Sequence, residues 1–277
     1  MTQPPAEKRN IADFLARHAV AIVGMNVRND ESGKRLGVET VFGTGFLMVY
    51  RSIPFLLTAG HIVHRLDEFL KKPNSRLYVN IVDSLHYNPE DRHVLWLPYE
   101  GLRRQSIGNN DDIDYGLILL DTITYGGLAK NNIVPVVYEN WRNPPDIFQR
   151  YFLVGIPAEL VTVETNSKLP QVTGATGAMI EVKPTDDPPE MLLKPFPRFY
   201  GKIDLTPVET EPHAIKDIGG MSGCPIIGVN FIEGRAHYWF YAIQSGWDEK
   251  DTIAACPFKP FAEHLQNQLD TVLDNDE

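Results

Sequence analysis

Three residues whose side chains can act together in nucleophilic catalysis occur at strand-to-loop junctions of this 277-residue chain. His61 closes the segment Leu57-Thr58-Ala59-Gly60-His61, Asp114 precedes the apolar run from Tyr115 to Leu120, and Ser222 lies among glycines. A serine hydroxyl becomes a strong nucleophile when an imidazole takes its proton, and a carboxylate fixes the tautomer of that imidazole. The pattern therefore indicates His61, Asp114 and Ser222 as a candidate catalytic triad.

The serine belongs to the segment Gly219-Gly220-Met221-Ser222-Gly223-Cys224-Pro225, which precedes the apolar residues 226–229. This composition predicts a tight turn that leads into a strand. Glycines at 220 and 223 remove side chains that would crowd the backbone, so the N–H groups of Gly220 and Ser222 can point at one spot. We predict that these two amides form an oxyanion hole.

The three segments resemble the sequence motifs of the chymotrypsin-like (trypsin-like) serine peptidases, especially bacterial members without a prodomain. Residues 58–61 are similar to the histidine motif, 114–119 to the aspartate motif and 220–225 to the serine motif. A fourth segment, 242–247, is similar to the strand that lines the substrate cleft, which implies Gln244, Ser245 and Gly246 as substrate-binding residues. The resemblance extends from about residue 40 to residue 247.

The resemblance implies a trypsin-like serine endopeptidase that hydrolyses peptide bonds through an acyl-enzyme, with a protein or peptide as substrate and no cofactor or metal. One residue departs from the family pattern. Digestive members have an acidic residue before the serine that captures the N-terminus freed by zymogen cleavage, and this chain has Met221. We therefore predict no activation by N-terminal cleavage. We also expect restrained activity, through narrow specificity or a regulatory protein partner.

The same residues admit several alternative functions. A catalytically silent module that keeps the peptidase fold and binds a peptide or partner protein is the main one, and an esterase acting on small acyl groups is another. The α/β-hydrolase elbow is set aside, because Cys224 stands where that motif has glycine and the order of the three residues is different. His61 and His64 form His-x-x-His, but no further zinc ligands follow at suitable spacing. Asp112 competes with Asp114 as the acid.

Composition narrows the class of protein. The formal net charge of −10, from 36 acidic and 26 basic residues, does not suggest a nucleic-acid partner. No apolar run has the length of a membrane span, and the first residues lack the apolar core of a signal peptide, so a cytoplasmic location is expected. Cys224 and Cys256 are the only cysteines, too few for a disulfide framework.

The arrangement of apolar runs and turn signals predicts an all-β fold of two six-stranded antiparallel β-barrels, with a short N-terminal helix and a C-terminal helix. The expected units are residues 1–125 with His61 and Asp114, a linker at 126–147, and residues 148–277 with Ser222. The segment Leu102-Arg103-Arg104 is expected to be a solvated loop. Counting back from Ser222 puts Ile215, Lys216 and Asp217 near the base of the specificity pocket, which leaves the substrate residue unnamed.

Overall fold

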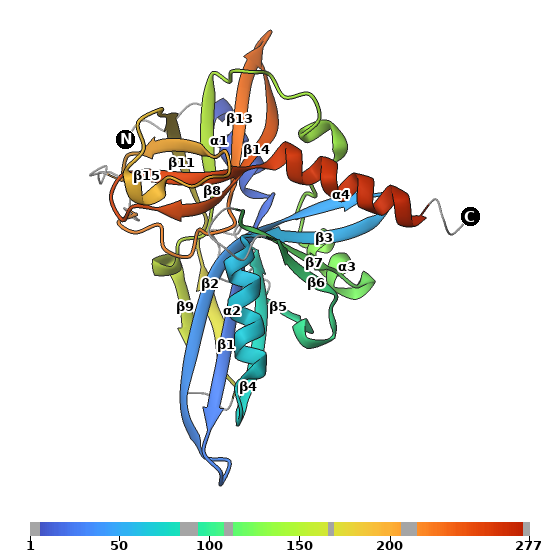
Figure 1. Ribbon diagram of the computed structural model, residues 1–277, viewed down its shortest axis with the longest axis vertical. Helices are drawn as coiled ribbons and strands as arrows, with labels where there is room; N and C mark the ends of the chain where they lie inside the picture. Colours follow the sequence, from blue (N-terminus) through green and yellow to red (C-terminus); the bar gives the residue numbers. More distant parts are fainter. Residues whose placement is uncertain (1–5, 84–93, 108–112, 166–168, 206–214, 274–277) are drawn as a thin grey trace.

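The computed structural model describes residues 6–83, 94–107, 113–165, 169–205 and 215–273. Its strands form a seven-stranded antiparallel sheet in the N-terminal half and a closed six-stranded barrel in the C-terminal half (Figure 1). Four α-helices and a separate β-hairpin complete the described part of the chain. Within these ranges no helix has both the length and the apolar character that crossing a membrane requires.

The N-terminal sheet carries the segments that lead to His61 and Asp114. In spatial order its strands are β5 (Val94–Leu97), β4 (Ser75–Asp83), β1 (Ala19–Asn29), β2 (Arg35–Tyr50), β3 (Ile53–Thr58), β7 (Tyr115–Leu119) and β6 (Arg104–Ile107). The expected closed barrel of six strands needs correction here, because the sheet has seven strands and no ladder joins its edge strands β5 and β6 within the described residues. The additional strand is β6, which was not predicted and which begins at Arg104, the last residue of the expected loop 102–104. Its backbone pairs with β7, from Arg104 opposite Ile118 to Ile107 opposite Tyr115.

The C-terminal barrel confirms the second predicted barrel. Its strands, in order around the closed sheet, are β11 (Ala178–Pro184), β12 (Phe199–Ile203), β15 (Thr252–Pro257), β14 (Arg235–Trp247), β13 (Pro225–Ile232) and β8 (Arg150–Gly155). The hairpin of β9 (Val161–Glu164) and β10 (Gln171–Ala175) was not predicted. The Ser222 loop directly precedes β13.

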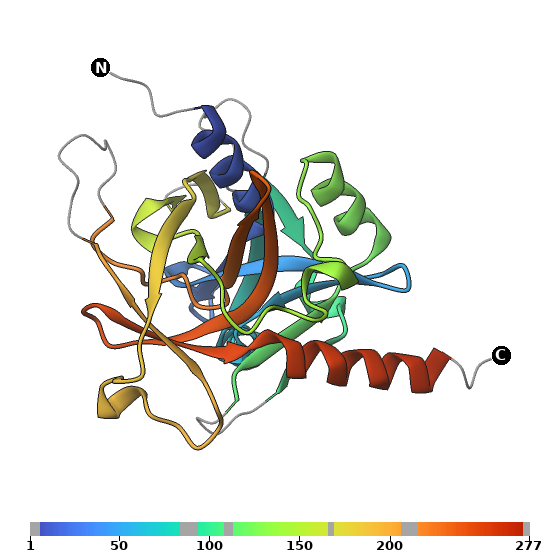
Figure 2. The same cartoon turned by 90° about the horizontal axis from the view of Figure 1, so that it is seen from above.

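The helices lie outside the two β-structures. They are α1 (Ala6–Ala16), α2 (Gly60–Lys71), α3 (Thr122–Lys130) and α4 (Phe258–Leu273), with short 3₁₀ turns η2 (Tyr99–Gly101), η3 (Tyr138–Asn140), η4 (Ala158–Leu160) and η5 (Glu190–Leu192). Helix α3 occupies the start of the expected linker, because the side chain of Asp121 accepts the Thr124 N–H and caps the helix. Helix α4 projects sideways from the barrel (Figure 2). Its Asp270 accepts a hydrogen bond from the Tyr50 hydroxyl at 2.9 Å, which ties α4 to the end of β2.

One hydrophobic cluster continues from the sheet into the barrel. Phe46 of β2 packs against Phe240 of β14 and Phe258 of α4, with ring centroids 5.2 and 5.6 Å apart. The ring of Tyr115 stacks on Phe261 at 4.6 Å. All five side chains are buried. Since burial of aromatic surface contributes roughly 25 cal/mol per Å², this shared core is expected to hold the two halves in a fixed arrangement.

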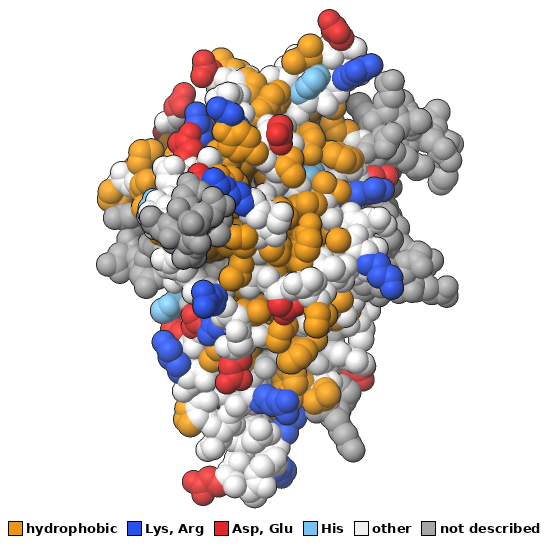
Figure 3. All heavy atoms as spheres, turned by 90° about the vertical axis from the view of Figure 1, so that its right-hand side faces the viewer, with side chains coloured by type: hydrophobic (Ala, Val, Ile, Leu, Met, Phe, Trp, Pro, Cys, Tyr) orange, Lys and Arg blue, Asp and Glu red, His pale blue; other side chains and the backbone are white. Residues whose placement is uncertain are grey.

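The surface on the side toward which α4 projects is mixed in character. Lys and Arg side chains are interspersed with Asp and Glu on this face, and hydrophobic side chains occupy a central band (Figure 3). No extended region of one charge sign is visible among the described residues on this face.

His18 is a buried titratable residue distant in sequence from the candidate triad. Its ring is inaccessible to solvent and packs edge-on against Phe14 and Phe240, and its Nδ1 lies 2.8 Å from the carbonyl oxygen of Val134. Within the described residues its Nε2 atom has no hydrogen-bond partner. Burial disfavours the charged imidazolium and lowers the pKa of His18 from 6.5 to about 4.

This shift predicts a pH dependence of stability. Between pH 6.5 and 4 the unfolded state binds a proton at this residue and the folded state does not. The stability that neutral His18 contributes is therefore complete above pH 6.5 and is lost as the pH falls toward 4. The expected loss is about 3 kcal/mol, from roughly 1.4 kcal/mol per pKa unit.

The measurement is the free energy of unfolding by denaturant at several pH values between 7 and 4. His18→Leu should remove this part of the pH dependence of the free energy of unfolding. His264 is exposed, so His264→Gln is a control that should retain it. Equal slopes for wild type and His18→Leu would contradict the assignment.

Candidate active site

His61 and Asp114 are brought together by the pairing of two strands. His61 is the second residue of α2, directly after β3, and Asp114 directly precedes β7. Because β3 and β7 are antiparallel neighbours, with Thr58 opposite Gly116, the two residues meet at the same edge of the sheet. Asp114 Oδ2 lies 2.7 Å from His61 Nδ1, and Asp114 Oδ1 accepts the His61 backbone N–H at 2.8 Å. A side chain at Gly60 would crowd this carboxylate, since an added Cβ would lie 2.9 Å from Oδ1.

This contact fixes the state of the imidazole. The carboxylate is an acceptor, so in the neutral ring this contact favours the tautomer with the proton on Nδ1, which leaves the Nε2 lone pair to accept a proton from another group. The His61 side chain is 47% exposed and that of Asp114 only 15%. The thiol of Cys256, whose pKa is raised by burial, lies next to Asp114. The pair therefore has the geometry of an oriented general base.

The Ser222 loop has an unusual backbone that only glycine accommodates. Gly220 and Gly223 have φ values of +85° and +92°. A Cβ at Gly220 would lie 2.8 Å from the backbone nitrogen of Ala158, and one at Gly223 would overlap the carbonyl oxygen of Thr44 and the hydroxyl of Thr58. Both positions therefore require glycine, for the positive φ and for the short distance to neighbouring backbone.

Each peptide group of the loop is anchored through its carbonyl oxygen. The oxygen of Gly219 accepts the Ala158 N–H at 2.7 Å, and that of Met221 accepts the Cys224 N–H at 2.9 Å. The oxygen of Gly220 accepts the Thr44 hydroxyl at 3.3 Å, and that of Ser222 accepts the Thr44 N–H at 2.9 Å. The four consecutive carbonyls are thus fixed by residues of the loop and of both halves.

The N–H groups of the same peptides follow an alternating pattern. Met221 N–H donates to Ile218 and Gly223 N–H donates to Gln244, both at 2.9 Å. Within the described residues the amides of Gly220 and Ser222 have no acceptor. In a trans peptide the N–H points opposite to the C=O, so the anchored oxygens of Gly219 and Met221 fix the direction of these two free amides. Two oriented, unpaired donors around a serine are suited to binding an oxyanion.

Met221 is held by packing. Its side chain is inaccessible to solvent and belongs to the core of the barrel with Ile218 and Cys224. Burial raises the pKa of the Cys224 thiol to about 12, so this thiol is neutral at ordinary pH. The loop therefore rests on an apolar base.

The loop approaches the histidine without a hydrogen bond to it. Gly223 packs against Thr58 and Ala59, the residues that lead into His61. Ser222 is half-buried, and within the described residues no hydrogen bond joins its hydroxyl to the imidazole. Hydrogen bonds between catalytic groups are often long in ligand-free enzymes and tighten when substrate binds, so the gap is compatible with a triad.

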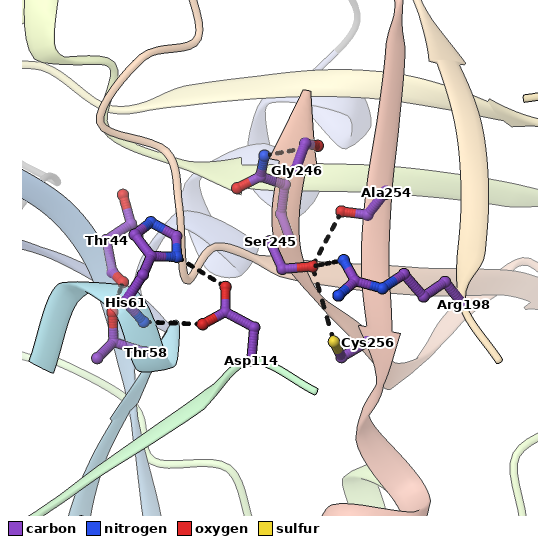
Figure 4. A network of polar contacts seen from close by, with 10 residues as sticks. Thr44, Thr58, His61, Asp114, Arg198, Ser245, Gly246, Ala254 and Cys256 are labelled. Atoms are coloured by element: carbon purple, nitrogen blue, oxygen red, sulfur yellow. Dashed lines mark hydrogen bonds and ion pairs between the residues drawn. The ribbon is translucent and has the colours of Figure 1, made fainter. Parts of the chain in front are cut away.

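A cleft of about 430 Å³ opens beside His61. Figure 4 shows the Asp114 carboxylate facing the His61 ring and the Ser245 hydroxyl facing the Arg198 guanidinium, which donates to it at 2.9 Å. Ser245 and Gly246 line this cleft, and the side chain of Gln244 is buried beside it. The cleft is lined by Gly60, His61, His64, Ile113, Asp114, Met191, Leu192, Lys194, Arg198, Ser245, Gly246 and Trp247.

Of the remaining candidates among the described residues, His64 lines this cleft, whereas Lys216 and Asp217 do not. Asp112 falls outside the described residues. The backbone N–H groups of Lys216 and Asp217 donate to the carboxylate of Glu159, and both residues are exposed. His64 pairs with Glu68 on the surface of α2. Within the described ranges no three His, Cys, Asp or Glu side chains are grouped as metal ligands.

The sequence analysis missed three residues that support the site. Thr44 and Ala158 anchor the serine loop, and Cys256 lies next to Asp114. The glycines on either side of Thr44 were a usable signal, because they mark a place where other backbone approaches closely. Ala158 and Cys256 carry no comparable signal in the sequence.

The contact at Gly223 gives a stability prediction with an internal control. Gly223→Ala adds both the strain of a positive φ and overlap with the backbone at Thr44, so it should lower the free energy of unfolding by at least about 3 kcal/mol. Gly234 has a φ of +76° with open space around it, and Gly234→Ala should cost only about 1–2 kcal/mol. Denaturant unfolding of both variants measures the difference, and equal losses would contradict the close approach.

Comparison with known proteins gives limited information. No protein-family model matches the chain. A search of curated proteins also finds no match. Among solved structures the chain is similar to a thermostable serine protease from an extremophilic microorganism, with 17% identity over 94% of this chain and 99% of that chain, and a TM-score of 0.49. At this distance the similarity assigns neither a family nor an activity to the chain.

Proposed function

We propose that the protein is a serine endopeptidase in which Ser222 is the nucleophile, His61 the general base and acid, and Asp114 the residue that orients His61. The proposal is carried by two features that occur together. The oriented amides of Gly220 and Ser222 have no acceptor within the described residues, and the Asp114 carboxylate already orients the His61 imidazole. These are the two groups that acyl transfer to serine requires.

The proposed reaction proceeds in two steps. Ser222 Oγ attacks the carbonyl carbon of the scissile peptide while its proton passes to His61 Nε2. The tetrahedral oxyanion accepts hydrogen bonds from the Gly220 and Ser222 amides, and the imidazolium then protonates the leaving amine, which departs and leaves an acyl-enzyme. In the second step His61 takes a proton from a water molecule, whose oxygen attacks the ester carbon. The acid product then leaves, and His61 gives the proton to Ser222 Oγ. Each oxyanion donor contributes about 3–4 kcal/mol to such a transition state.

The end of β14 favours an extended peptide as substrate. β13 pairs with β14 only as far as Ile243, whereas β15 pairs with it as far as Trp247. Residues 245–247 therefore have one strand edge without a partner within the described residues. An extended peptide can add to such an edge through main-chain hydrogen bonds, as peptide-binding proteins commonly do. This edge lies on the cleft with His61.

The second candidate function is a catalytically silent module that binds a peptide or partner protein in the same cleft. The observation in its favour is that the Ser222 hydroxyl has no hydrogen bond to His61 within the described residues. An esterase acting on small acyl groups is the third candidate. The strand edge at 245–247 favours a peptide over a small ester.

Covalent labelling separates these functions. A fluorophosphonate probe should add to wild type once, as read by intact mass, because an activated serine and an oxyanion hole together drive its phosphylation. Ser222→Ala should form no adduct. Ser75→Ala is the matched control, since it removes a serine hydroxyl that donates to the Lys72 carbonyl oxygen outside the cleft and should label like wild type. A folded wild type that forms no adduct would favour the silent module, and peptide against small-ester substrates would then separate peptidase from esterase.

The role of Asp114 is tested by Asp114→Asn. An amide at this position favours the wrong tautomer of His61, so labelling and turnover should fall about 10⁴-fold with the fold retained. Asp121→Asn, which alters the cap of α3 instead, should leave turnover near wild type. A comparable loss in Asp112→Asn with near-normal Asp114→Asn would show that Asp112 is the acid.

A further inference from the structure

The hydroxyl of Thr44 lies at the point where the two halves meet behind the serine loop. Thr44 belongs to β2 of the N-terminal sheet and is inaccessible to solvent. Its hydroxyl donates to the carbonyl oxygen of Gly220 at 3.3 Å and accepts the backbone N–H of Ile156, which follows β8 of the barrel, at 3.2 Å. A single side chain of one half therefore contacts two backbone segments of the other.

The backbone of Thr44 is fixed independently of this side chain. Its N–H donates to Ser222, and its carbonyl oxygen accepts the Thr58 hydroxyl at 2.7 Å. Thr58 is the last residue of β3, three residues before His61. The position of the Thr44 hydroxyl is therefore set by the same strands that carry the histidine.

The surroundings leave room for a hydroxyl at this position. A Cβ at Gly155 would overlap the Cys224 thiol and lie 3.1 Å from the Thr44 hydroxyl, so only glycine at 155 lets these groups meet. The Thr44 hydroxyl also lies beside the Cys224 thiol. Since Cys224 and Gly220 lie at the two ends of the segment that contains Ser222, one hydroxyl touches both ends of the turn.

An anchor at Gly220 has a specific consequence for the oxyanion site. The Thr44 hydroxyl holds the C=O of the peptide between Gly220 and Met221, whose N–H donates to Ile218. That peptide separates the two free amides. If it rotates, the Gly220 and Ser222 N–H groups no longer point to one spot, because each lies in a peptide group adjacent to it. Met221, being apolar, offers no charged group that could hold the turn instead.

We propose that the Thr44 hydroxyl is a positioning residue that holds the Gly220 and Ser222 amides in oxyanion-binding geometry. This proposal rests on the proposed function, but its structural part, that the hydroxyl keeps the turn in place, can be tested without catalysis. Thr44 contacts no reacting atom and acts through Gly220.

The kinetic test compares three variants with wild type, using the rate of fluorophosphonate labelling as a function of probe concentration and pH. Thr44→Val keeps the shape of the side chain without the hydroxyl, and should lower the maximal labelling rate about 10- to 100-fold, a part of what loss of one oxyanion donor costs. The half-saturating probe concentration should stay within about twofold, because the cleft is unchanged. Thr44→Ser restores the hydroxyl and should stay within about threefold of wild type.

Two features separate positioning from general destabilisation. The pH midpoint of labelling should not change in Thr44→Val, since the His61–Asp114 pair is untouched. Thr124→Val removes another buried threonine hydroxyl, one that bonds Asp121 in α3, and should leave labelling unchanged. Equal losses in Thr44→Val and Thr124→Val, a shifted pH midpoint, or full labelling by Thr44→Val would each overturn the proposal. Thr44→Ala, which is smaller, replaces Thr44→Val if that variant does not fold.

Hydrogen exchange provides a test of the proposal that does not depend on activity. The Met221 amide donates to Ile218 within the turn and the Gly223 amide donates to Gln244 of β14. Exchange of a peptide covering 218–224 should therefore speed up in Thr44→Val and not in Thr44→Ser or Thr124→Val. Unchanged exchange in Thr44→Val overturns the proposal whatever the labelling result. If wild type does not label at all, the proposed function fails, and faster exchange in Thr44→Val alone would still support Thr44 as the residue that holds the turn.

Discussion

The structure depends on one close approach, that of the Ser222 loop to Thr44 within β2. The loop can reach the N-terminal sheet only because Gly223 has no side chain, so that its Cα lies against the backbone of Thr44 and Ala59. The hydrogen bond from Thr44 N–H to the Ser222 carbonyl oxygen then fixes the distance between the two halves at the site. A larger residue would separate the nucleophile from the base by moving whole elements, because the shared aromatic core resists local adjustment.

The contacts across this boundary divide the chemistry between the halves. The sheet supplies the imidazole and its carboxylate, and the barrel supplies the serine and the two free amides. Residues at the end of β15 reach back to the sheet, where Cys256 lies next to Asp114 and the Pro257 carbonyl oxygen accepts the Tyr115 hydroxyl at 2.6 Å. Asp114 is thus positioned from both sides, so the orientation of His61 depends on the barrel as well as on its own sheet.

Much of the strand order could be predicted from the sequence, and the exceptions have physical causes. Largely apolar runs such as 19–27 and 53–58 are long enough to identify strands without tertiary information. β6 is short and polar, and becomes a strand only because β7 offers it backbone partners, so no local pattern could reveal it. The residue types at 61, 114, 220 and 222 indicated the site, since glycine and the triad chemistry are distinctive. Thr44, Ala158 and Cys256 act through backbone or buried contacts that depend on the folded arrangement, which spacing along the chain does not encode.

The way the serine loop is held bears on how activity would be controlled. Ala158 N–H, Cys224 N–H, Thr44 N–H and the Thr44 hydroxyl anchor its four carbonyls, and none of these donors is an ionisable group. A loop anchored by an α-amino group would loosen when that group loses its proton, near pH 8. Here the geometry of the free amides is independent of such a charge, and Met221 is sealed in the barrel core. If the proposed function is right, the oxyanion site is complete as folded, and restraint on activity has to act on access to the cleft rather than on the loop.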